Sequence, residues 1–375
     1  MKVAVQTDQL WFSAPGGIGT YVWELVEALA VMQGDDRPAL TTFHARFGGE
    51  PSRRFTRALD DVEIASSIKA LYPSWNLLGR PHLPDTLGSH DVLHATNPAS
   101  VPPAGDGQAL VVTVHDLAFD HFPELFPRDW RLLYRMGARA AIKRADLLLV
   151  PSQATRADLV ARGADPDHVR VTPLAASLPD GGADPDDVLA RLGIPRPFVL
   201  SPGTLEPRKN QARLVRAYRR VAPDVPHALV LAGPDGWLIE ELDRELGRPG
   251  PGTIVRTGRL EPEELDALYR AADLVAYPSR YEGFGLIILE AMARGVPVLT
   301  STTPACAEVA ADAAVLVDPL DVEAIADALA DLLTDPARRA DLAALGTQRA
   351  AGFSWAATAR ATLDAYREAT ERVHR

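Results

Sequence analysis

The residues best able to do chemistry lie in the sequence YEGFGLIILE, which follows an apolar strand pattern. Glu282 stands near its start, and Glu290 lies eight residues further on. Gly283 and Gly285 leave the backbone around Phe284 open. Carboxylates accept hydrogen bonds from hydroxyl groups, and open N–H groups at a helix start bind phosphate. The pattern predicts a site for a polyol beside a phosphate. The alternative is a helix whose Glu290 faces solvent, which the apolar run LIILEAMA disfavours.

A pair of cations, Arg208 and Lys209, occurs in the sequence FVLSPGTLEPRKNQARLV. A strand pattern runs into Gly203 there, and the two cations stand just ahead of a helix pattern. Cations are unfavourable at a helix N-terminus unless an anion joins them. In an acidic protein this pair therefore predicts an anionic ligand such as a diphosphate. The alternative is a basic cap on a surface helix.

Two weaker signals lie in the first half of the chain. Gly16, Gly17 and Gly19 stand between the first strand pattern and an amphipathic helix, where backbone N–H groups can approach a ligand. Their spacing is not the dinucleotide G-x-G-x-x-G, so a tight turn without a ligand stays an alternative. His115 and Asp116 follow a strand in VVTVHDLAF, at the sheet edge where ligands of α/β proteins bind. The alternative there is a structural hydrogen-bonded pair.

Strands and helices that alternate along the chain must position these groups. Strands are expected at residues 3–5, 40–44, 62–65, 92–95 and 110–114, with a helix over about 17–32. A second series is expected at residues 198–200, 228–232, 254–257, 274–277, 298–300 and 314–317. The halves share a phrase, ADLLLVPSQA from Ala145 and ADLVAYPSRY from Ala272, each a buried strand ending in Pro-Ser. This βαβ rhythm predicts an α/β fold with two doubly wound parallel sheets.

Composition predicts where the halves divide. Residues 172–187, TPLAASLPDGGADPDD, are rich in Pro, Gly and Asp, as linkers are. The DPD strings at Asp165 and Asp184 are predicted to form turns. A last helix is expected from Ser354, as its N-cap, to about Val373.

Charge and cysteine usage exclude several classes of protein. The 375 residues carry a net charge of -11, which excludes a nucleic-acid partner that needs a basic face. Cys306 is the single cysteine, which favours a reducing compartment, most simply the cytoplasm. The apolar runs are too short for a signal peptide or a membrane span. We expect a protein that is soluble or at most peripheral on a membrane.

Together these motifs resemble family 4 of the GT-B glycosyltransferases, over nearly the whole chain. Glu282 and Glu290 have that family's E-x7-E spacing, with its Glu-Gly-Phe-Gly-Leu opening. The glycine loop, the His-Asp pair, the Glu-Pro-Arg-Lys-Asn segment and a closing FSW helix follow in the family's order. The resemblance implies two Rossmann-like domains that face each other across a cleft. These are an acceptor-side domain over residues 1–176, a nucleotide-sugar-binding domain over 177–354, and a helix over 355–375 that returns to the N-terminal domain.

The resemblance also implies a role for each matching position. Arg208 and Lys209 would neutralise the departing diphosphate with help from the glycine loop. Glu290 would bind the ribose and Glu282 the donor hexose, while His115 would contact that sugar near the reacting carbon. The implied catalytic residues are His115, Arg208, Lys209 and Glu282, and the implied donor-binding residues are Gly16, Gly17, Gly19, Asp116, Gly203, Gly258, Gly283, Phe284, Gly285, Leu286 and Glu290.

The mechanism implied is front-face transfer with retention, in which the leaving diphosphate takes the acceptor's proton. Positive groups would stabilise the charge that develops on it. No Asp-x-Asp stands where a metal would be expected, so no metal and no cofactor are expected; the nucleotide sugar is a co-substrate.

The donor and acceptor are less sharply indicated. The sequence VTVHDLAFDHFPELFP is similar to that of mannosyltransferases that build bacterial cell-surface polysaccharides, which implies GDP-mannose first and UDP- or dTDP-hexoses as alternatives. The acceptor would be a glycan, a lipid-linked molecule or a small molecule. A GT-B-fold sugar-nucleotide epimerase or hydrolase, and a non-catalytic module that binds a nucleotide sugar, remain rival interpretations.

Two N-terminal segments are candidates for acceptor-side contacts. Residues 70–84 are apolar, aromatic and Pro-rich, which predicts a loop. Arg131, Arg135, Arg139 and Lys143 recur every four residues along a predicted helix. That stripe could rest on an anionic membrane, or it could be an ordinary solvated face.

Overall fold

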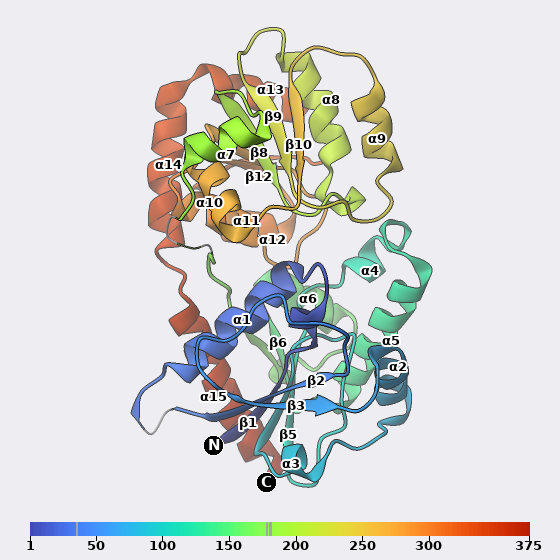
Figure 1. Cartoon of the computed structure of the whole chain (residues 1–375). Helices are drawn as coiled ribbons and strands as arrows, with labels where there is room; N and C mark the ends of the chain where they lie inside the picture. The colour runs from blue at the N-terminus through green and yellow to red at the C-terminus, as the bar shows by residue number, and fades with distance from the viewer. Residues whose placement is uncertain (35–36, 178, 180–181) are drawn as a thin grey trace. The chain divides into compact units, whose positions relative to one another are not determined.

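The computed structural model describes residues 1–34, 37–177, 179 and 182–375. It divides the chain into two compact units (Figure 1). Unit 1 contains Met1–Leu174 and Ser354–Arg375, and unit 2 contains Ala175–Phe353. Each unit is built around one parallel sheet, so the predicted α/β fold with two doubly wound sheets is confirmed.

Unit 1 has a seven-stranded sheet in the order β3-β2-β1-β4-β5-β6-β7. The strands are β1 (Lys2–Gln6), β2 (Ala39–Ala45), β3 (Asp60–Ile64), β4 (Val92–Ala95), β5 (Ala109–Thr113), β6 (Leu147–Val150) and β7 (Val169–Val171). The helices are α1 (Gly16–Ala30), α2 (Ile68–Leu78), α3 (Asp85–Gly88), α4 (Ala118–His121), α5 (Arg128–Arg144), α6 (Gln153–Ala161) and α15 (Trp355–Val373).

The core of unit 1 forms because its central strands are continuous apolar runs with helices on their faces. Every residue of β4, β5 and β6 is buried. Helix α15 packs on α1 and on β5, and its Tyr366 is fully buried. Ser354 caps this helix by accepting from the Ala357 N–H at 3.2 Å, as predicted. The last helix is therefore an integral part of unit 1.

Unit 2 has a six-stranded sheet in the order β10-β9-β8-β11-β12-β13. The strands are β8 (Phe198–Pro202), β9 (Ala228–Ala232), β10 (Ile254–Gly258), β11 (Leu274–Tyr277), β12 (Val298–Ser301) and β13 (Val315–Val317). The helices are α7 (Pro185–Leu192), α8 (Gln211–Val221), α9 (Glu240–Gly247), α10 (Pro262–Ala271), α11 (Leu286–Ala293), α12 (Pro304–Ala310), α13 (Val322–Thr334) and α14 (Pro336–Ala350).

The strand order of each unit reverses direction once. In unit 2 the chain moves outward from β8 to β10 and then returns to place β11 on the other side of β8. The pair is parallel, with Leu274 opposite Val199 and Val275 opposite Leu200. In open α/β sheets, ligands bind beyond the carboxyl ends of the strands at such a reversal. The loops that follow β8 and β11 are therefore the natural place for a site in unit 2.

One prediction about a loop was wrong. Residues 70–84 are helix α2 as far as Leu78, because Leu71, Tyr72 and Trp75 on one face are buried and hold the helix despite the Pro73 inside it. The predicted linker over residues 172–187 contains the boundary between the units, which lies between Leu174 and Ala175. Its last residues form the first turn of α7, whose N-cap is Asp184. Residues 178, 180 and 181 of that linker lie outside the described residues.

The two DPD strings do cap short helical turns. Asp165 accepts from the Asp167 N–H at 2.9 Å, and Asp184 accepts from the Asp186 N–H at 2.8 Å. Each carboxylate thus satisfies a backbone donor at the start of a helical segment.

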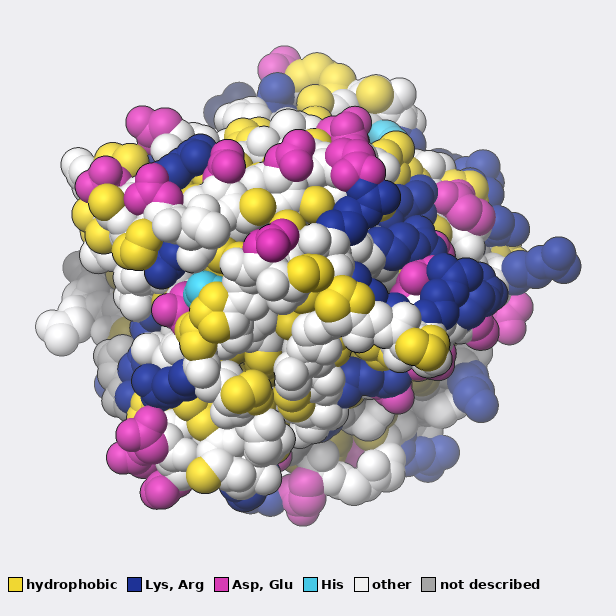
Figure 2. Space-filling view, turned by 90° about the horizontal axis from the view of Figure 1, so that it is seen from above, with side chains coloured by type: hydrophobic (Ala, Val, Ile, Leu, Met, Phe, Trp, Pro, Cys, Tyr) yellow, Lys and Arg dark blue, Asp and Glu magenta, His cyan; other side chains and the backbone are white. Residues whose placement is uncertain are grey.

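The surface is not uniformly acidic despite the net charge of -11. Figure 2 shows a face on which Lys and Arg side chains gather on the right, with Asp and Glu side chains around them. Local groups of cations can therefore select anions that the whole protein would repel. Among the described residues, no helix has both the length and the apolar character that a membrane span requires.

Candidate functional site

The cations predicted after β8 and the first acid predicted after β11 meet in unit 2. Lys209 Nζ donates to Glu282 Oε1 at 2.8 Å, and Arg208 Nη1 donates to Glu282 Oε2 at 2.8 Å. The two cations and Glu282 lie far apart in sequence, and they are in contact because β8 and β11 are neighbours in the sheet. The structure therefore brings three of the predicted catalytic residues together.

Backbone and side-chain contacts hold the two loops in register. The cations lie in a 3₁₀ turn, Pro207–Lys209, that ends at Asn210 with φ 65°. The Asn210 Nδ2 donates to the carbonyl oxygen of Pro278 at 2.9 Å, and the Arg280 N–H donates to the carbonyl oxygen of Arg208 at 2.8 Å. Asn tolerates this left-handed backbone better than most residues do. The ion pairs thus rest on a fixed scaffold.

Two further side chains surround Glu282. Tyr277 Oη and Ser279 Oγ each donate to Glu282 Oε1 at 2.6 Å. Tyr277 also contacts Lys209, whose ammonium lies 4.9 Å from the centroid of its ring. Sequence reasoning missed Tyr277 and Ser279 as site residues, although both belong to the repeated phrase ADLVAYPSRY, whose Tyr-Pro-Ser marks a strand end.

Arg208 is shared between two carboxylates. Its Nη2 donates to Glu206 Oε1 at 2.6 Å, while its Nη1 donates to Glu282 Oε2. Both carboxylates are buried, with 3% of Glu206 and 9% of Glu282 exposed. Sequence reasoning missed Glu206, because nothing in the sequence shows that its side chain turns back toward Arg208.

The electrostatics of this group favour a charged Glu282. Burial by itself raises the pKa of a carboxyl, but the adjacent Arg208 and Lys209 outweigh it and lower the pKa of Glu282 to about 2. The two cations and the two carboxylates neutralise each other locally. An anionic ligand that took over the cations would free Glu282 to accept hydrogen bonds from hydroxyl groups.

Glycines bring the backbone of these loops close together. Gly203 has φ +112° just after β8, and Gly285 has φ +106° at the start of α11, both in the region that favours glycine. Gly233, which was not predicted, approaches so closely that a Cβ there would lie 2.2 Å from the carbonyl oxygen of Gly203. Gly283 and Phe284 are buried, and Leu286 is the first residue of α11.

Glu290 lies on α11 and is half-buried, and its Oε2 accepts from Tyr269 Oη at 2.9 Å. The alternative of a fully solvent-facing Glu290 is thus not what the structure shows. Gly258 ends β10 with φ 73°, near Arg256, which pairs with Asp235 and Asp243. Glu290 and Gly258 remain predicted donor contacts.

The predicted glycine loop of unit 1 is largely the first turn of α1. Gly16 begins the helix with φ 57°, and Gly16 and Gly17 are exposed. Gly19 is buried, and a Cβ there would lie 2.4 Å from the Pro15 Cβ, so its glycine is required by packing. The N–H groups at the start of a helix have no partner within the helix, which suits an anion.

His115 follows β5 and is held in one orientation. Its Nε2 donates to the carbonyl oxygen of Thr96 at 2.9 Å, and its ring lies edge to face with Tyr21, with centroids 4.8 Å apart. Burial lowers the pKa of His115 to about 4, so the imidazole is neutral at neutral pH. Since Nε2 must carry the proton to donate to a carbonyl, Nδ1 is a hydrogen-bond acceptor. Asp116 Oδ1 accepts from the Ala118 N–H at 3.0 Å, which explains it as a local cap.

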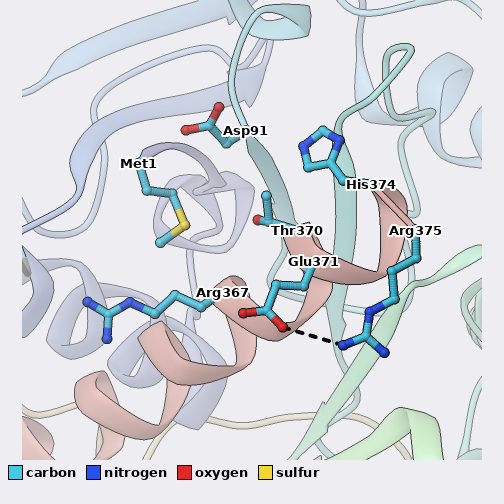
Figure 3. A pocket seen from close by; sticks show the side chains of 7 residues that line it. All are labelled: Met1, Asp91, Arg367, Thr370, Glu371, His374 and Arg375. Atoms are coloured by element: carbon cyan, nitrogen blue, oxygen red, sulfur yellow. Dashed lines mark ion pairs between the residues drawn. The ribbon is translucent and has the colours of Figure 1, made fainter.

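In the described parts of the chain, no three or more His, Cys, Asp or Glu side chains are arranged to hold a metal ion. A pocket of about 650 Å³ lies elsewhere in unit 1, at the amino ends of β1 and β4 (Figure 3). Its lining residues are Met1, Asp91, Arg367, Thr370, Glu371, His374 and Arg375. That is the opposite edge of the sheet from His115.

Comparison with known families gives one match for each half of the chain. Residues 15–178 match the model described as Glycosyltransferase Family 4, and residues 190–349 match the model described as Glycosyl transferases group 1. Among curated proteins, the chain is 31% identical to O-antigen chain mannosyltransferase B of Escherichia coli, over 98% of this chain and 100% of that protein. It is 34% identical to a D-inositol 3-phosphate glycosyltransferase of Kineococcus radiotolerans, over 63% of this chain and 60% of that protein.

Solved structures show the same fold. HepE of Anabaena, in complex with UDP and glucose, has a TM-score of 0.72 at 19% identity, over 97% of this chain and 98% of that one. WaaG, a glycosyltransferase involved in lipopolysaccharide biosynthesis, has a TM-score of 0.69 at 18% identity, over 96% of this chain and 98% of that one. At such identities the likeness concerns the fold, and it supports the predicted GT-B architecture.

Proposed function

This chain belongs to family 4 of the GT-B glycosyltransferases, and from that premise we propose that it is a retaining hexosyltransferase whose preferred donor is GDP-mannose. The acceptor is a glycan, a lipid-linked molecule or a small molecule. The likeness to an O-antigen mannosyltransferase over the full length supports mannose. The complexes of HepE contain UDP and glucose, so UDP-hexoses are the next candidates; dTDP-hexoses follow.

The observation that carries this proposal is the ion-pair group of Arg208, Lys209 and Glu282. Two cations beside a buried carboxylate make a site that can exchange one anion for another. The donor's diphosphate replaces Glu282 as the partner of the cations, and Glu282 then accepts hydrogen bonds from hydroxyl groups of the hexose. In unit 1, His115 offers its acceptor Nδ1 to a sugar hydroxyl.

The transfer balances without an enzymic nucleophile. The bond from the anomeric carbon to the diphosphate oxygen breaks, and a bond from the same carbon to the acceptor oxygen forms on the same face. The acceptor's proton passes to the departing diphosphate. Arg208 and Lys209 stabilise the negative charge that grows on the diphosphate as the bond breaks.

The test is an assay of purified protein with GDP-mannose, UDP-glucose or a dTDP-hexose, each with and without candidate acceptors. We expect nucleoside diphosphate release that depends on an acceptor, together with a product whose anomeric configuration matches the donor's. Full-rate turnover of the donor alone would instead identify an epimerase or hydrolase. Binding without any turnover would identify a nucleotide-sugar-binding module.

Replacing Glu290 by Ala is expected to weaken nucleoside diphosphate binding by about tenfold, because the ribose loses a charge-assisted hydrogen bond. Calorimetry of the wild type and the variant measures this. The matched control is Glu308→Ala, on the same unit. Equal affinity of wild type and Glu290→Ala would contradict the ribose assignment.

Removal of divalent metal is expected to leave transfer intact. The proposed charge stabilisation comes from the side chains of Arg208 and Lys209, so no bound cation is needed for it. The measurement is the transfer rate before and after exhaustive treatment with a chelator. Complete loss of activity, restored by added Mg²⁺ or Mn²⁺, would refute the metal-free mechanism.

A further inference from the structure

We propose that unit 1 contains a second anion site, a pocket that binds a phosphate monoester or diphosphate group. The pocket has a volume of about 480 Å³ and lies where α4, α5 and the end of α6 meet. It is lined by Asp120, Arg135, Arg139, Ile142 and Arg162. Two of these arginines belong to the stripe predicted from the sequence, so that stripe is not merely a solvated face.

The charges of the pocket do not balance. Asp120 Oδ1 accepts from Arg135 Nε at 2.7 Å, and Asp120 also forms an ion pair with Arg162. Arg139 lines the same pocket and has no acidic partner among the described residues. Three guanidinium groups therefore line a pocket whose lining contains one carboxylate, and only two of them pair with it. Their mutual repulsion is relieved when an anion enters the pocket.

Arg162 is the best placed of the three to bind that anion. Its guanidinium lies 5.6 Å from the centroid of the Phe119 ring, and burial lowers the pKa of Arg162. Within the described chain its Nε is buried and has no hydrogen-bond acceptor. A buried donor without an acceptor is costly, so an oxygen supplied by a ligand would stabilise it. Asp120 holds Arg162 and Arg135 in position for this.

A purely structural role does not account for this arrangement. Other contacts already hold helix α4 against its neighbours. His121 Nε2 lies 3.2 Å from Asp158 Oδ2, and Phe119 stacks on Tyr134 with ring centroids 5.5 Å apart. The packing of α4 therefore does not require a third arginine, Arg139, in the lining of the same pocket. The planar fork of each guanidinium matches the oxygens of a phosphate group.

The phosphate group can come from a soluble molecule or from a lipid. Leu132 lies three residues before Arg135, on the same face of α5, and is 61% exposed. An apolar side chain beside a phosphate pocket suits an amphiphilic ligand, but the pocket's own chemistry is the same for either source.

The first arm of the test titrates the full-length protein with inorganic pyrophosphate in a calorimeter. We expect Arg139→Ala to remove or weaken one site by about tenfold. Arg128→Ala, at an exposed position of the same helix outside the pocket, should bind like the wild type. Identical titrations of wild type and Arg139→Ala, or no binding by either, would overturn the proposal. Arg139 is exposed, so its replacement should leave the melting temperature unchanged.

The second arm measures sedimentation with phosphatidylcholine vesicles that contain phosphatidic acid or phosphatidylglycerol. Retention by phosphatidic acid alone, reduced in Arg139→Ala, would identify a lipid-borne monoester as the source. Pyrophosphate binding without retention would identify a soluble one. Equal retention by both lipids with no pyrophosphate site would show general charge attraction and overturn the pocket.

This inference rests on unit 1 and does not depend on the proposed transfer. Lys209→Ala should leave the Arg139-dependent pyrophosphate site intact while it impairs donor use. The failure of one proposal is therefore distinguishable from the failure of the other.

Discussion

Replacing Lys209 by Ala is expected to lower kcat/KM for hexose transfer by about one to two orders of magnitude. The ammonium makes a charge-assisted contact worth roughly 1.5 to 3 kcal/mol, and the proposed diphosphate needs that contact most when its charge grows. The fall should appear in kcat as well as in KM, because an interaction that strengthens in the transition state acts on both.

The variant must be separated from simple damage to the fold. Lys209→Ala leaves Glu282 with Arg208, Tyr277 and Ser279 as partners, so the carboxylate stays compensated. Lys69→Ala, which removes an exposed lysine from α2, is the matched control and should transfer at the wild-type rate. Unchanged kinetics in Lys209→Ala, with a folded protein, would remove this residue from the site.

Replacing Glu282 by Gln is expected to destabilise the protein by roughly 3 kcal/mol at neutral pH. Burial favours the neutral acid, but Arg208 and Lys209 lower the pKa of Glu282 from 4.5 to about 2. A tenfold change in a protonation equilibrium corresponds to about 1.4 kcal/mol between the two protonation states. The uncharged Gln also leaves two buried cations with less compensation.

The sign of the pH dependence follows from the lowered pKa. The contribution of Glu282 to stability is fully present above the unfolded-state pKa of 4.5 and is lost as pH falls through the folded-state pKa of about 2. Thermal unfolding of both proteins at several pH values should show the deficit of Glu282→Gln shrinking below about pH 5. Glu323→Gln, which breaks an exposed pair with Arg220, should cost at most about 1 kcal/mol. A deficit for Glu282→Gln that is constant with pH would contradict the ion-pair account.

The sequence was sufficient to predict most strands of this protein and to single out Arg208, Lys209 and Glu282, which the structure brings together. Strands at 92–95, 228–232 and 274–277 occur with the predicted bounds, because buried parallel strands are continuous apolar runs. The contact between Lys209 and Glu282 could be predicted only in part from the sequence, because it depends on β8 and β11 being neighbours, which is a property of the whole sheet. A family resemblance could suggest that β8 and β11 are neighbours, whereas local patterns of residues along the chain could not.

What the sequence did not reveal depends on side-chain direction and on helix packing. Tyr277 and Ser279 look like ordinary strand-end residues until their hydroxyl groups are seen to converge on Glu282. Residues 70–84 look like a loop because Pro73 lowers helix propensity, yet burial of Trp75 and its neighbours outweighs it. The pocket around Arg139 could not be predicted from the stripe on α5 alone, because Asp120 and Arg162 in its lining come from two other segments.

The central claim is that Arg208, Lys209 and Glu282 form the site of a sugar diphosphate. The most direct measurement is a crystal structure of the protein with GDP-mannose or its nucleoside diphosphate. We expect diphosphate oxygens at about 2.7 to 3.0 Å from Lys209 Nζ and the Arg208 guanidinium, with Glu282 released to accept from hexose hydroxyl groups. A bound nucleotide whose diphosphate lies elsewhere, with the Lys209–Glu282 pair unchanged, would contradict the claim.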